Sequence, residues 1–138
     1  MDRRTLLVSA CAGCAALVAG CGGGSPAPAT RATVPAGSAP GTLLRLADLA
    51  VGSSALATGP DGAAVVVTRT GEATAVGLSP VCPHQGCAVA PQDAELVCPC
   101  HGSRFDPVTG AVRRGPAEQA LAAFGVRVED GDVLPAEP

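Results

Sequence analysis

Two short segments contain nearly all of the side chains in this chain that commonly bind metals, and they constrain its fold more than any other feature. The segments read Cys82-Pro83-His84-Gln85-Gly86-Cys87 and Cys98-Pro99-Cys100-His101-Gly102-Ser103. Both histidines of the chain lie in them, together with all four cysteines that follow residue 21. Because thiolates and imidazoles are the usual ligands of zinc and iron centres, we expect the fold to bring both segments around one site.

The composition indicates one small domain that needs cross-links. The chain has 138 residues, two Phe and no Trp or Tyr. A core without large aromatic side chains buries little apolar area, so a metal site and a disulfide are expected to stabilise it. The chain has no Lys and a net charge of −3. Since the clustered basic residues of a nucleic-acid-binding surface are missing from the sequence, we expect no nucleic-acid partner.

Residues 1–20 have the layout of a secretory signal peptide. Arg3 and Arg4 precede an apolar run that ends at Gly20. A membrane-spanning helix needs about 20 apolar residues, so this shorter run favours a cleaved signal over a retained anchor, which is the alternative. The paired arginines followed by Thr-Leu-Leu resemble a twin-arginine export signal, a route that carries folded proteins. An ordinary signal with a basic start is the other alternative.

Cys21 is the expected site of a lipid anchor. The preceding residues complete the sequence Leu-Val-Ala-Gly-Cys, which resembles a bacterial lipobox, where the cysteine is acylated and becomes the new N-terminus. Each buried methylene of a lipid contributes about 0.8 kcal/mol, so several chains anchor stably. Residues 21–41, rich in Gly, Ser, Pro and Ala, are expected to form a flexible linker. The sequence thus predicts a bacterial lipoprotein, exported to the outer side of the cytoplasmic membrane.

Residues 42–138 are expected to form one all-β domain. Short apolar or alternating runs are separated by Gly, Pro and Asp, which is typical of a β-sandwich or small barrel. The expected strands are Leu43–Leu46, Ala63–Arg69, Ala73–Gly77, Glu95–Cys98, Ala111–Arg113, Gly125–Val128 and Asp132–Leu134. Ala117–Ala123 is the one segment with helical potential, since Pro116 before it suits a first helical position.

The spacing of the ligands resembles the Rieske family. Cys82 and His84 are two residues apart, and Cys98 and His101 are three apart. In Rieske proteins a 2Fe-2S cluster has two cysteines on one iron and two histidines on the other. The resemblance implies that Cys82 and Cys98 bind one iron and that His84 and His101 bind the other iron of a single 2Fe-2S cluster.

The same resemblance implies a fold and a cross-link. It covers residues 42–138 and implies a small Rieske-type antiparallel β-sandwich with a cluster-binding subdomain of two loops. Cys87 and Cys100 would form the disulfide that joins these loops, and Gly115-Pro116-Ala117 resembles the proline-rich loop that covers the cluster.

Two further positions are expected to tune the cluster. Ser103 matches the position whose hydroxyl donates a hydrogen bond to a bridging sulfide in high-potential members. Phe105 stands where such members often have Tyr, so we expect a lower reduction potential, although Phe105 can also serve simple packing. Asp106 is expected to be a turn residue because Pro107 follows it. Arg113 and Arg114 are expected to be solvated, with contact to a partner as the alternative.

A structural zinc site is the main alternative at the level of the metal, since two Cys and two His also suit tetrahedral zinc. Zinc fingers usually pair Cys with Cys and His with His along the chain, whereas here each segment offers one of each. The extra cysteine pair also favours the disulfide-containing Rieske class, because disulfides persist outside the reducing cytoplasm.

The expected function is electron transfer through the 2Fe-2S cluster. The disulfide-containing class resembles the iron-sulfur subunit of cytochrome bc complexes, which takes an electron from membrane quinol, beside cytochrome b, and passes it to a cytochrome c. A stand-alone extracytoplasmic Rieske ferredoxin serving another oxidase is the first alternative. A binding lipoprotein stabilised by zinc is the second.

Overall fold

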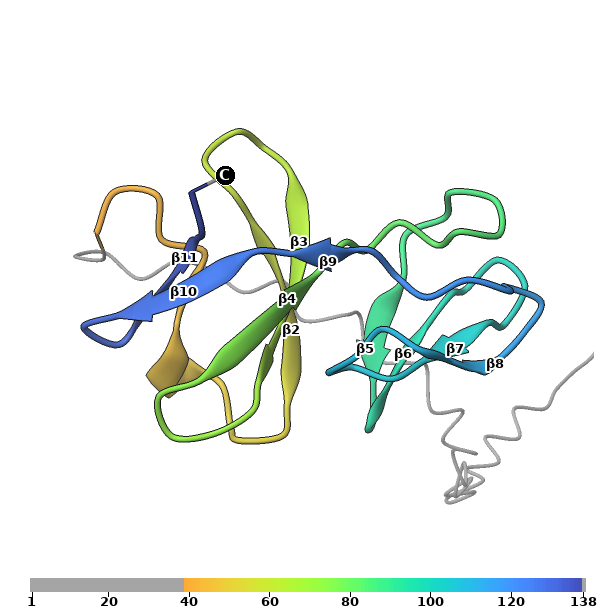
Figure 1. Cartoon of the computed structure of the whole chain (residues 1–138), viewed down its shortest axis with the longest axis horizontal. Helices are drawn as coiled ribbons and strands as arrows, with labels where there is room; N and C mark the ends of the chain where they lie inside the picture. The colour runs from red at the N-terminus through yellow and green to blue at the C-terminus, as the bar shows by residue number, and fades with distance from the viewer. Residues whose placement is uncertain (1–38, 138) are drawn as a thin grey trace, which may run out of the picture.

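The computed structural model describes residues 39–137, and these residues form small antiparallel sheets. Figure 1 shows the three sheets side by side along the length of the molecule. The first sheet has the order β1 (Leu44–Arg45), β11 (Asp132–Pro135) and β10 (Val126–Glu129). The second has the order β2 (Ser54–Thr58), β3 (Ala64–Arg69), β4 (Ala75–Leu78) and β9 (Ala123–Phe124). The third has the order β5 (Ala90–Gln92), β6 (Glu95–Val97), β7 (Arg104–Phe105) and β8 (Val112–Arg114). The all-β prediction is confirmed.

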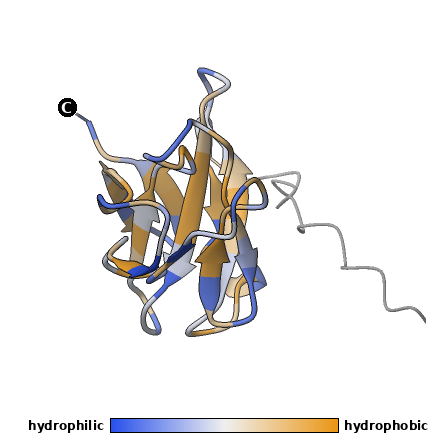
Figure 2. Ribbon diagram, turned by 90° about the vertical axis from the view of Figure 1, so that its right-hand side faces the viewer, coloured by the Kyte–Doolittle hydropathy of each residue, from blue (hydrophilic) through white to orange (hydrophobic). Residues whose placement is uncertain are grey.

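The first two sheets form a base whose core is aliphatic. Val65 and Val67 of β3 pack into this core together with Val133 of β11. Val66, which points to the opposite face of the same strand, packs into a second core. Because successive side chains of a strand alternate between its faces, the continuous Val65–Val67 run is explained by burial of β3 on both sides. Figure 2 shows the apolar residues concentrated along these strands and the polar ones in the turns.

Residues 80–122, which include β5–β8, form a lobe at one end of the molecule (Figure 1). The second core connects this lobe to the base, since it contains Val66 and Leu78 of the base together with Phe105 of the lobe. A buried hydrogen bond adds to the connection: Thr68 Oγ1 donates to the carbonyl oxygen of Pro107 at 2.7 Å. Apolar packing and this bond fix the lobe on the second sheet.

Each of the seven expected strands overlaps an observed strand, but four observed strands were not predicted. These are β2, β5, β7 and β9. Small side chains dominate β2, Pro91 lies within β5, and the other two have only two residues each. Weak apolar alternation and proline are poor signals of a strand, so their pairing depends on the neighbouring strands.

The helix expected at Ala117–Ala123 is wrong. This segment is irregular up to β9, and its backbone groups bond to other loops. The N–H of Leu121 donates to the carbonyl of Gly110 at 3.0 Å, and the N–H of Ser79 donates to the carbonyl of Ala122 at 2.8 Å. Tertiary hydrogen bonds therefore replace the local ladder that a helix requires.

The predictions made for the N-terminal part fall outside the described residues. These are the signal peptide, the lipid anchor at Cys21 and nearly all of the linker. Across residues 39–137, the structure contains no helix with the length and apolar character needed to cross a membrane.

Candidate metal centre

Two loops of the same design carry the predicted ligands. In the first loop the N–H of Cys82 donates to the carbonyl of Cys87, and in the second the N–H of Cys98 donates to the carbonyl of Ser103. Each loop also has an N–H of glycine that bonds back to the carbonyl of its first cysteine. These glycines, Gly86 and Gly102, have φ of 76° and 75°. Since only glycine adopts that region at little cost, both loops need glycine at this point of the turn.

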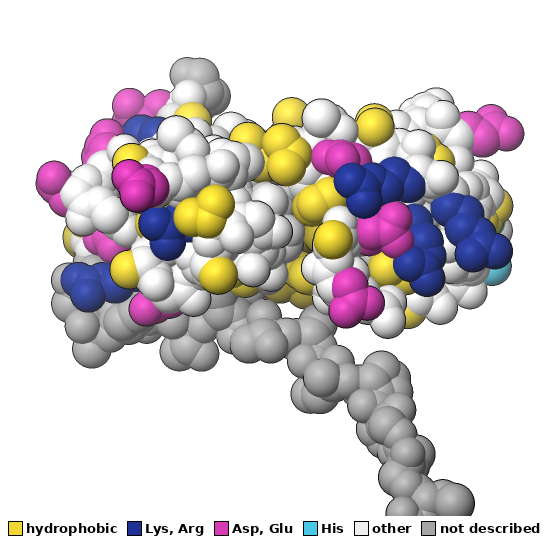
Figure 3. All heavy atoms as spheres, turned by 90° about the horizontal axis from the view of Figure 1, so that it is seen from below, with side chains coloured by type: hydrophobic (Ala, Val, Ile, Leu, Met, Phe, Trp, Pro, Cys, Tyr) yellow, Lys and Arg dark blue, Asp and Glu magenta, His cyan; other side chains and the backbone are white. Residues whose placement is uncertain are grey.

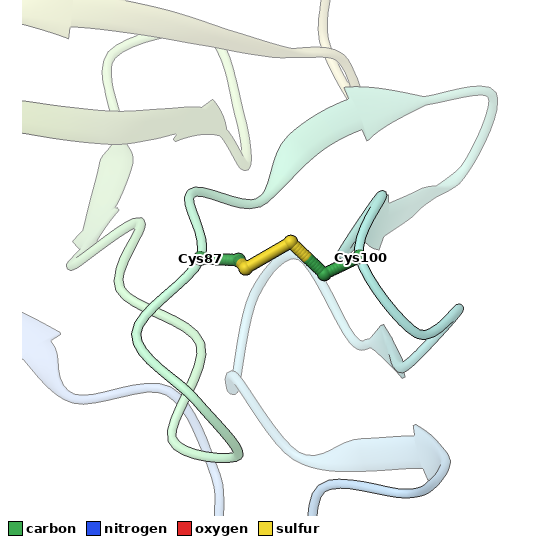
Figure 4. The surroundings of a disulfide bond; sticks show 2 residues. All are labelled: Cys87 and Cys100. Carbon is green, nitrogen blue, oxygen red and sulfur yellow. A yellow bond between two sulfur atoms is a disulfide. The ribbon is translucent and has the colours of Figure 1, made fainter.

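A disulfide joins the two loops. Cys87 and Cys100 are bonded, as the family resemblance implied, and their Cα atoms are 6.5 Å apart. Figure 4 shows the bond bridging the two loops. The bond holds the two loops together. It also stabilises this domain with its small core, because it restricts the unfolded chain.

Cys82 and Cys98 lie on the core side of the loops with free thiols. Only 1% of Cys82 and 2% of Cys98 is exposed, and both side chains belong to the second core. The Sγ atoms of Cys98, Cys87 and Cys100 lie within 4.8 Å of one another. Two of these three sulfurs already form the disulfide, so Cys98 is the sulfur of this group that remains available to a metal.

The two histidines lie together on the outer side. The centroids of the His84 and His101 rings are 4.9 Å apart, and the rings are nearly perpendicular. His101 is exposed and His84 is half-buried. The Nδ1 atom of His84 is buried and has no hydrogen-bond partner among the described residues. A buried ring nitrogen without a partner is unusual, and a metal ion would supply the missing interaction. The donor set therefore fits a centre with sulfur ligands inside and imidazole ligands outside.

Ser103 connects the second loop to the proline-rich loop. Its side chain is fully buried, and its Oγ accepts a hydrogen bond from the N–H of Ala117 at 3.0 Å. The Oγ atom is an acceptor in this bond, so its own proton remains available to donate to another group. That is the condition for the tuning role expected of Ser103.

Phe105 is fully buried in the second core with both free cysteines. Its ring fills the space beneath the loops and offers no hydrogen-bond donor. Packing is thus one role of this residue. Its ring has no hydroxyl group that could donate to a ligand sulfur, which is the reason for the lower reduction potential expected from the sequence.

Asp106 closes the turn between β7 and β8. Its Oδ1 accepts hydrogen bonds from the N–H groups of Thr109 and Val108, each at 2.8 Å. These bonds, together with the Arg113 guanidinium 2.7 Å from Oδ2, lower the pKa of Asp106 to about 2. Asp106 is therefore a turn residue, as expected, and Arg113 is held by an ion pair rather than simply solvated.

A pocket beside His84 was not foreseen. It has a volume of about 360 Å³ and is lined by Pro83, His84, Pro116, Glu118 and Gln119. The sequence signal was the polar Glu-Gln pair directly after Gly115-Pro116-Ala117. These side chains make the approach to His84 partly polar.

Comparison with known proteins shows the family. Residues 43–125 match the Rieske 2Fe-2S domain, and the chain therefore belongs to the Rieske family. The domain carries one 2Fe-2S cluster and transfers electrons through it. This finding favours the iron-sulfur interpretation over structural zinc.

The curated relatives are longer proteins. The chain is 44% identical over 73 residues to the cytochrome b6-f complex iron-sulfur subunit of Prochlorococcus marinus, covering 51% of this chain and 40% of that protein. It is 42% identical over 91 residues to the cyanelle cytochrome b6-f complex iron-sulfur subunit 2 of Cyanophora paradoxa, covering 63% of this chain and 37% of that protein. The chain thus spans less than half the length of these relatives.

Two solved structures match over nearly their whole length. One is the plasma membrane Rieske protein of the cyanobacterium Synechocystis, with 29% identity, a TM-score of 0.59, and coverage of 70% of this chain and 98% of that one. The other is the ferredoxin of carbazole 1,9a-dioxygenase from Nocardioides aromaticivorans, with 29% identity, a TM-score of 0.58, and coverage of 73% and 100%.

Proposed function

We propose that Cys82 and Cys98 bind one iron of the cluster and that His84 and His101 bind the other. The observation that carries this proposal is the buried, unpartnered Nδ1 of His84, next to the His101 ring and on the outer side of two buried free thiols. When bound, a 2Fe-2S cluster with two imidazole ligands supplies one-electron chemistry at about −150 to +300 mV.

The exposed imidazole side is suited to a partner that releases a proton with its electron. His101 is exposed, so a ring nitrogen that binds no metal can accept a hydrogen bond from a hydroxyl group. A quinol hydroxyl is such a donor. The buried thiols cannot accept a hydrogen bond from such a partner, because the core covers them.

From these features we infer that the protein acts as the iron-sulfur subunit of a quinol–cytochrome c oxidoreductase. Its partners would be membrane quinol with cytochrome b, and a cytochrome c. The Cys87–Cys100 disulfide supports this role, since the quinol-oxidising class usually has the pair and ferredoxins of dioxygenases generally lack it. The relatives in Prochlorococcus and Cyanophora are subunits of cytochrome b6-f complexes.

Purification from native membranes tests this role. A tagged chain is expected to co-purify with b-type and c-type haems in an assembly that oxidises quinol. Isolation of the cluster-loaded protein without haem, or with a molybdenum oxidase instead, would contradict the proposal.

A stand-alone extracytoplasmic ferredoxin is the second candidate. The match to nearly the whole of the ferredoxin of carbazole 1,9a-dioxygenase supports it, since the described part of this chain provides a comparable domain. Such a protein would deliver electrons to another oxidase, and the same purification separates it from the first candidate.

We also propose that residues 1–20 are a twin-arginine signal peptide, that residues 21–41 form a linker and that Cys21 is acylated on the outer side of the membrane. Two features of the sequence support this, namely Arg3-Arg4 and the Leu-Val-Ala-Gly-Cys motif. Cys21→Ser is expected to block processing or to release the domain from the membrane. A variant that stays membrane-bound at unchanged mass would contradict the lipid anchor.

A further inference from the structure

One face of the β5–β8 lobe gathers half of the arginines in the described residues. Arg104 lies on β7, and Arg113 and Arg114 lie on the edge strand β8. Figure 3 shows dark-blue side chains gathered at the end of the molecule where a histidine reaches the surface. We call Arg104, Arg113 and Arg114 the arginine face.

Pairing of the strands places all three side chains on the same side of the sheet. Arg104 and Arg113 both form ion pairs with Glu95, at 2.6 and 3.6 Å. Arg104 is opposite Arg114 in the register, whereas Phe105 is opposite Val112, so a bulge at Arg113 separates the two pairs. Residues opposite each other on neighbouring strands share a face, and Arg114 therefore lies beside Arg104.

Arg114 differs from the other arginines of residues 39–137. Asp132 binds Arg45, Glu129 binds Arg127, and Arg69 donates to four backbone carbonyls. Arg114 is exposed, and its side chain forms no hydrogen bond or ion pair within residues 39–137. Arg104, which lies opposite it, is paired with Glu95, so Arg114 is the arginine of this face whose charge has no partner among the described residues. A negative group from outside the protein could pair with it.

The arginine face borders the metal centre. Arg104 directly follows Ser103, the last residue of the second loop, and Arg114 directly precedes Gly115 and Pro116. Pro116 lines the pocket that contains His84. A partner that binds Arg114 would therefore lie at the end of the molecule where a histidine reaches the surface (Figure 3).

We propose that the arginine face orients a redox-protein partner whose own electron-transfer edge is surrounded by carboxylates. The inference rests on the proposed electron-transfer function and adds the chemistry of the partner to it. Charge complementarity of this kind raises the rate of encounter and is screened by salt. An anionic membrane is a poorer occupant, because lipid contact here would cover the site of electron transfer.

The test is the rate at which the dithionite-reduced, cluster-loaded protein gives one electron to small oxidants of opposite charge. Ferricyanide is the anionic probe and tris(phenanthroline)cobalt(III) the cationic probe. At low ionic strength Arg114→Glu is expected to slow oxidation by ferricyanide roughly five- to tenfold and to speed oxidation by the cobalt complex. At about 1 M salt, where the Debye length is about 3 Å, the differences between variants should vanish.

A matched control separates a local effect from net charge. Arg45→Glu makes the same change of charge in β1, in the first sheet of the base, and is expected to change both rates much less. Equal effects of the two variants, or a change of the same sign for both probes, would overturn the proposal. A shift of the same sign would mean that only the reduction potential had changed.

Further measurements distinguish a failure of this proposal from a failure of the proposed electron-transfer function. If Arg114→Glu loses the cluster, Arg114→Gln takes its place, with smaller shifts in the same directions; unchanged rates in it would overturn the proposal. A wild-type protein without a 2Fe-2S spectrum would instead contradict the proposed function.

An acidic c-type cytochrome should accept electrons faster than a basic one, and Arg114→Glu should reverse that order. Binding to phosphatidylglycerol vesicles that depends on Arg114 would assign the face to a membrane.

Discussion

At the scale of single residues, Phe105 is where a hydroxyl group could change the metal centre most directly. The side chain is fully buried in the core that contains Cys82 and Cys98. Phe105→Tyr is expected to raise the reduction potential, because a donor to a ligand sulfur stabilises the more negative reduced form. A hydrogen bond worth about 0.5–1.5 kcal/mol corresponds to about 20–65 mV for one electron.

Redox titration followed by visible absorption measures this shift. Phe105→Leu serves as the control, because it removes packing without adding a donor and should lower stability without raising the potential. An unchanged or lower potential in Phe105→Tyr would show that the tyrosine position has no such role in this chain.

Ser103 provides the second prediction at this scale. Ser103→Ala removes the acceptor for the N–H of Ala117 and the donor expected to serve the cluster. We expect a lower potential and a loss of roughly 1–3 kcal/mol in the free energy of unfolding, since a buried N–H loses its partner. Potentiometry and denaturant unfolding check the two effects separately. A loss of stability at unchanged potential would leave Ser103 with a structural role alone.

At the scale of elements, the turn between β7 and β8 depends on a charged carboxylate. Asp106 has a folded pKa of about 2, below its ordinary value of 3.8. A lowered folded pKa contributes stability above the unfolded value, and this contribution is lost as the pH falls from about 4 to about 2. Asp106→Asn keeps an oxygen that can accept the hydrogen bonds of the turn but loses the negative charge. This loss should lower the free energy of unfolding by about 1 kcal/mol at neutral pH.

The pH dependence separates charge from shape. Unfolding midpoints of wild type and Asp106→Asn should converge between about pH 4 and pH 2. Asp106→Ala, which also removes the acceptor of the turn, should remain less stable throughout that range. A constant difference between wild type and Asp106→Asn would mean that the carboxylate charge has no part in stabilising the turn.

The paired loops form the other element with a measurable contribution. The Cys87–Cys100 disulfide joins residues 13 apart in sequence, and closing such a loop stabilises a fold by about 3 kcal/mol. The Cys87→Ser/Cys100→Ser double variant is expected to lose about this much stability and to release its cluster faster. Thiol reductant should bring the wild type to the stability of the variant and leave the variant unaffected. Equal stability of oxidised wild type and variant would contradict the prediction.

At the scale of the whole molecule, sequence reasoning recovered the all-β class because Gly, Asp and Pro mark the turns and valines mark β3. It predicted the candidate centre because both histidines and all four cysteines after residue 21 are concentrated in two segments. It missed β5, because Pro91 within this strand is a poor signal of strand pairing. It also predicted a helix at Ala117–Ala123, whose backbone is hydrogen-bonded to loops distant in sequence. Tertiary contacts decide such segments, and local propensity does not report them.

The surroundings of the centre were beyond prediction for a related reason. The burial of His84 Nδ1 depends on how two loops meet, and the arginine face depends on the register of β7 and β8 and on the bulge at Arg113. A shift of one residue in a strand moves side chains to the other face. Spacing along the chain predicts which residues bind, whereas register determines what surrounds them.

The claim that most needs direct measurement is that two thiolates and two imidazoles bind one 2Fe-2S cluster. Pulsed EPR of the dithionite-reduced protein, with nitrogen-15 incorporated into histidine, tests it. We expect a mixed-ligand 2Fe-2S signal with hyperfine coupling to two histidine nitrogens, and Cys98→Ser should abolish it. A colourless protein with one zinc ion per chain, or a cluster signal without histidine nitrogen coupling, would contradict the account.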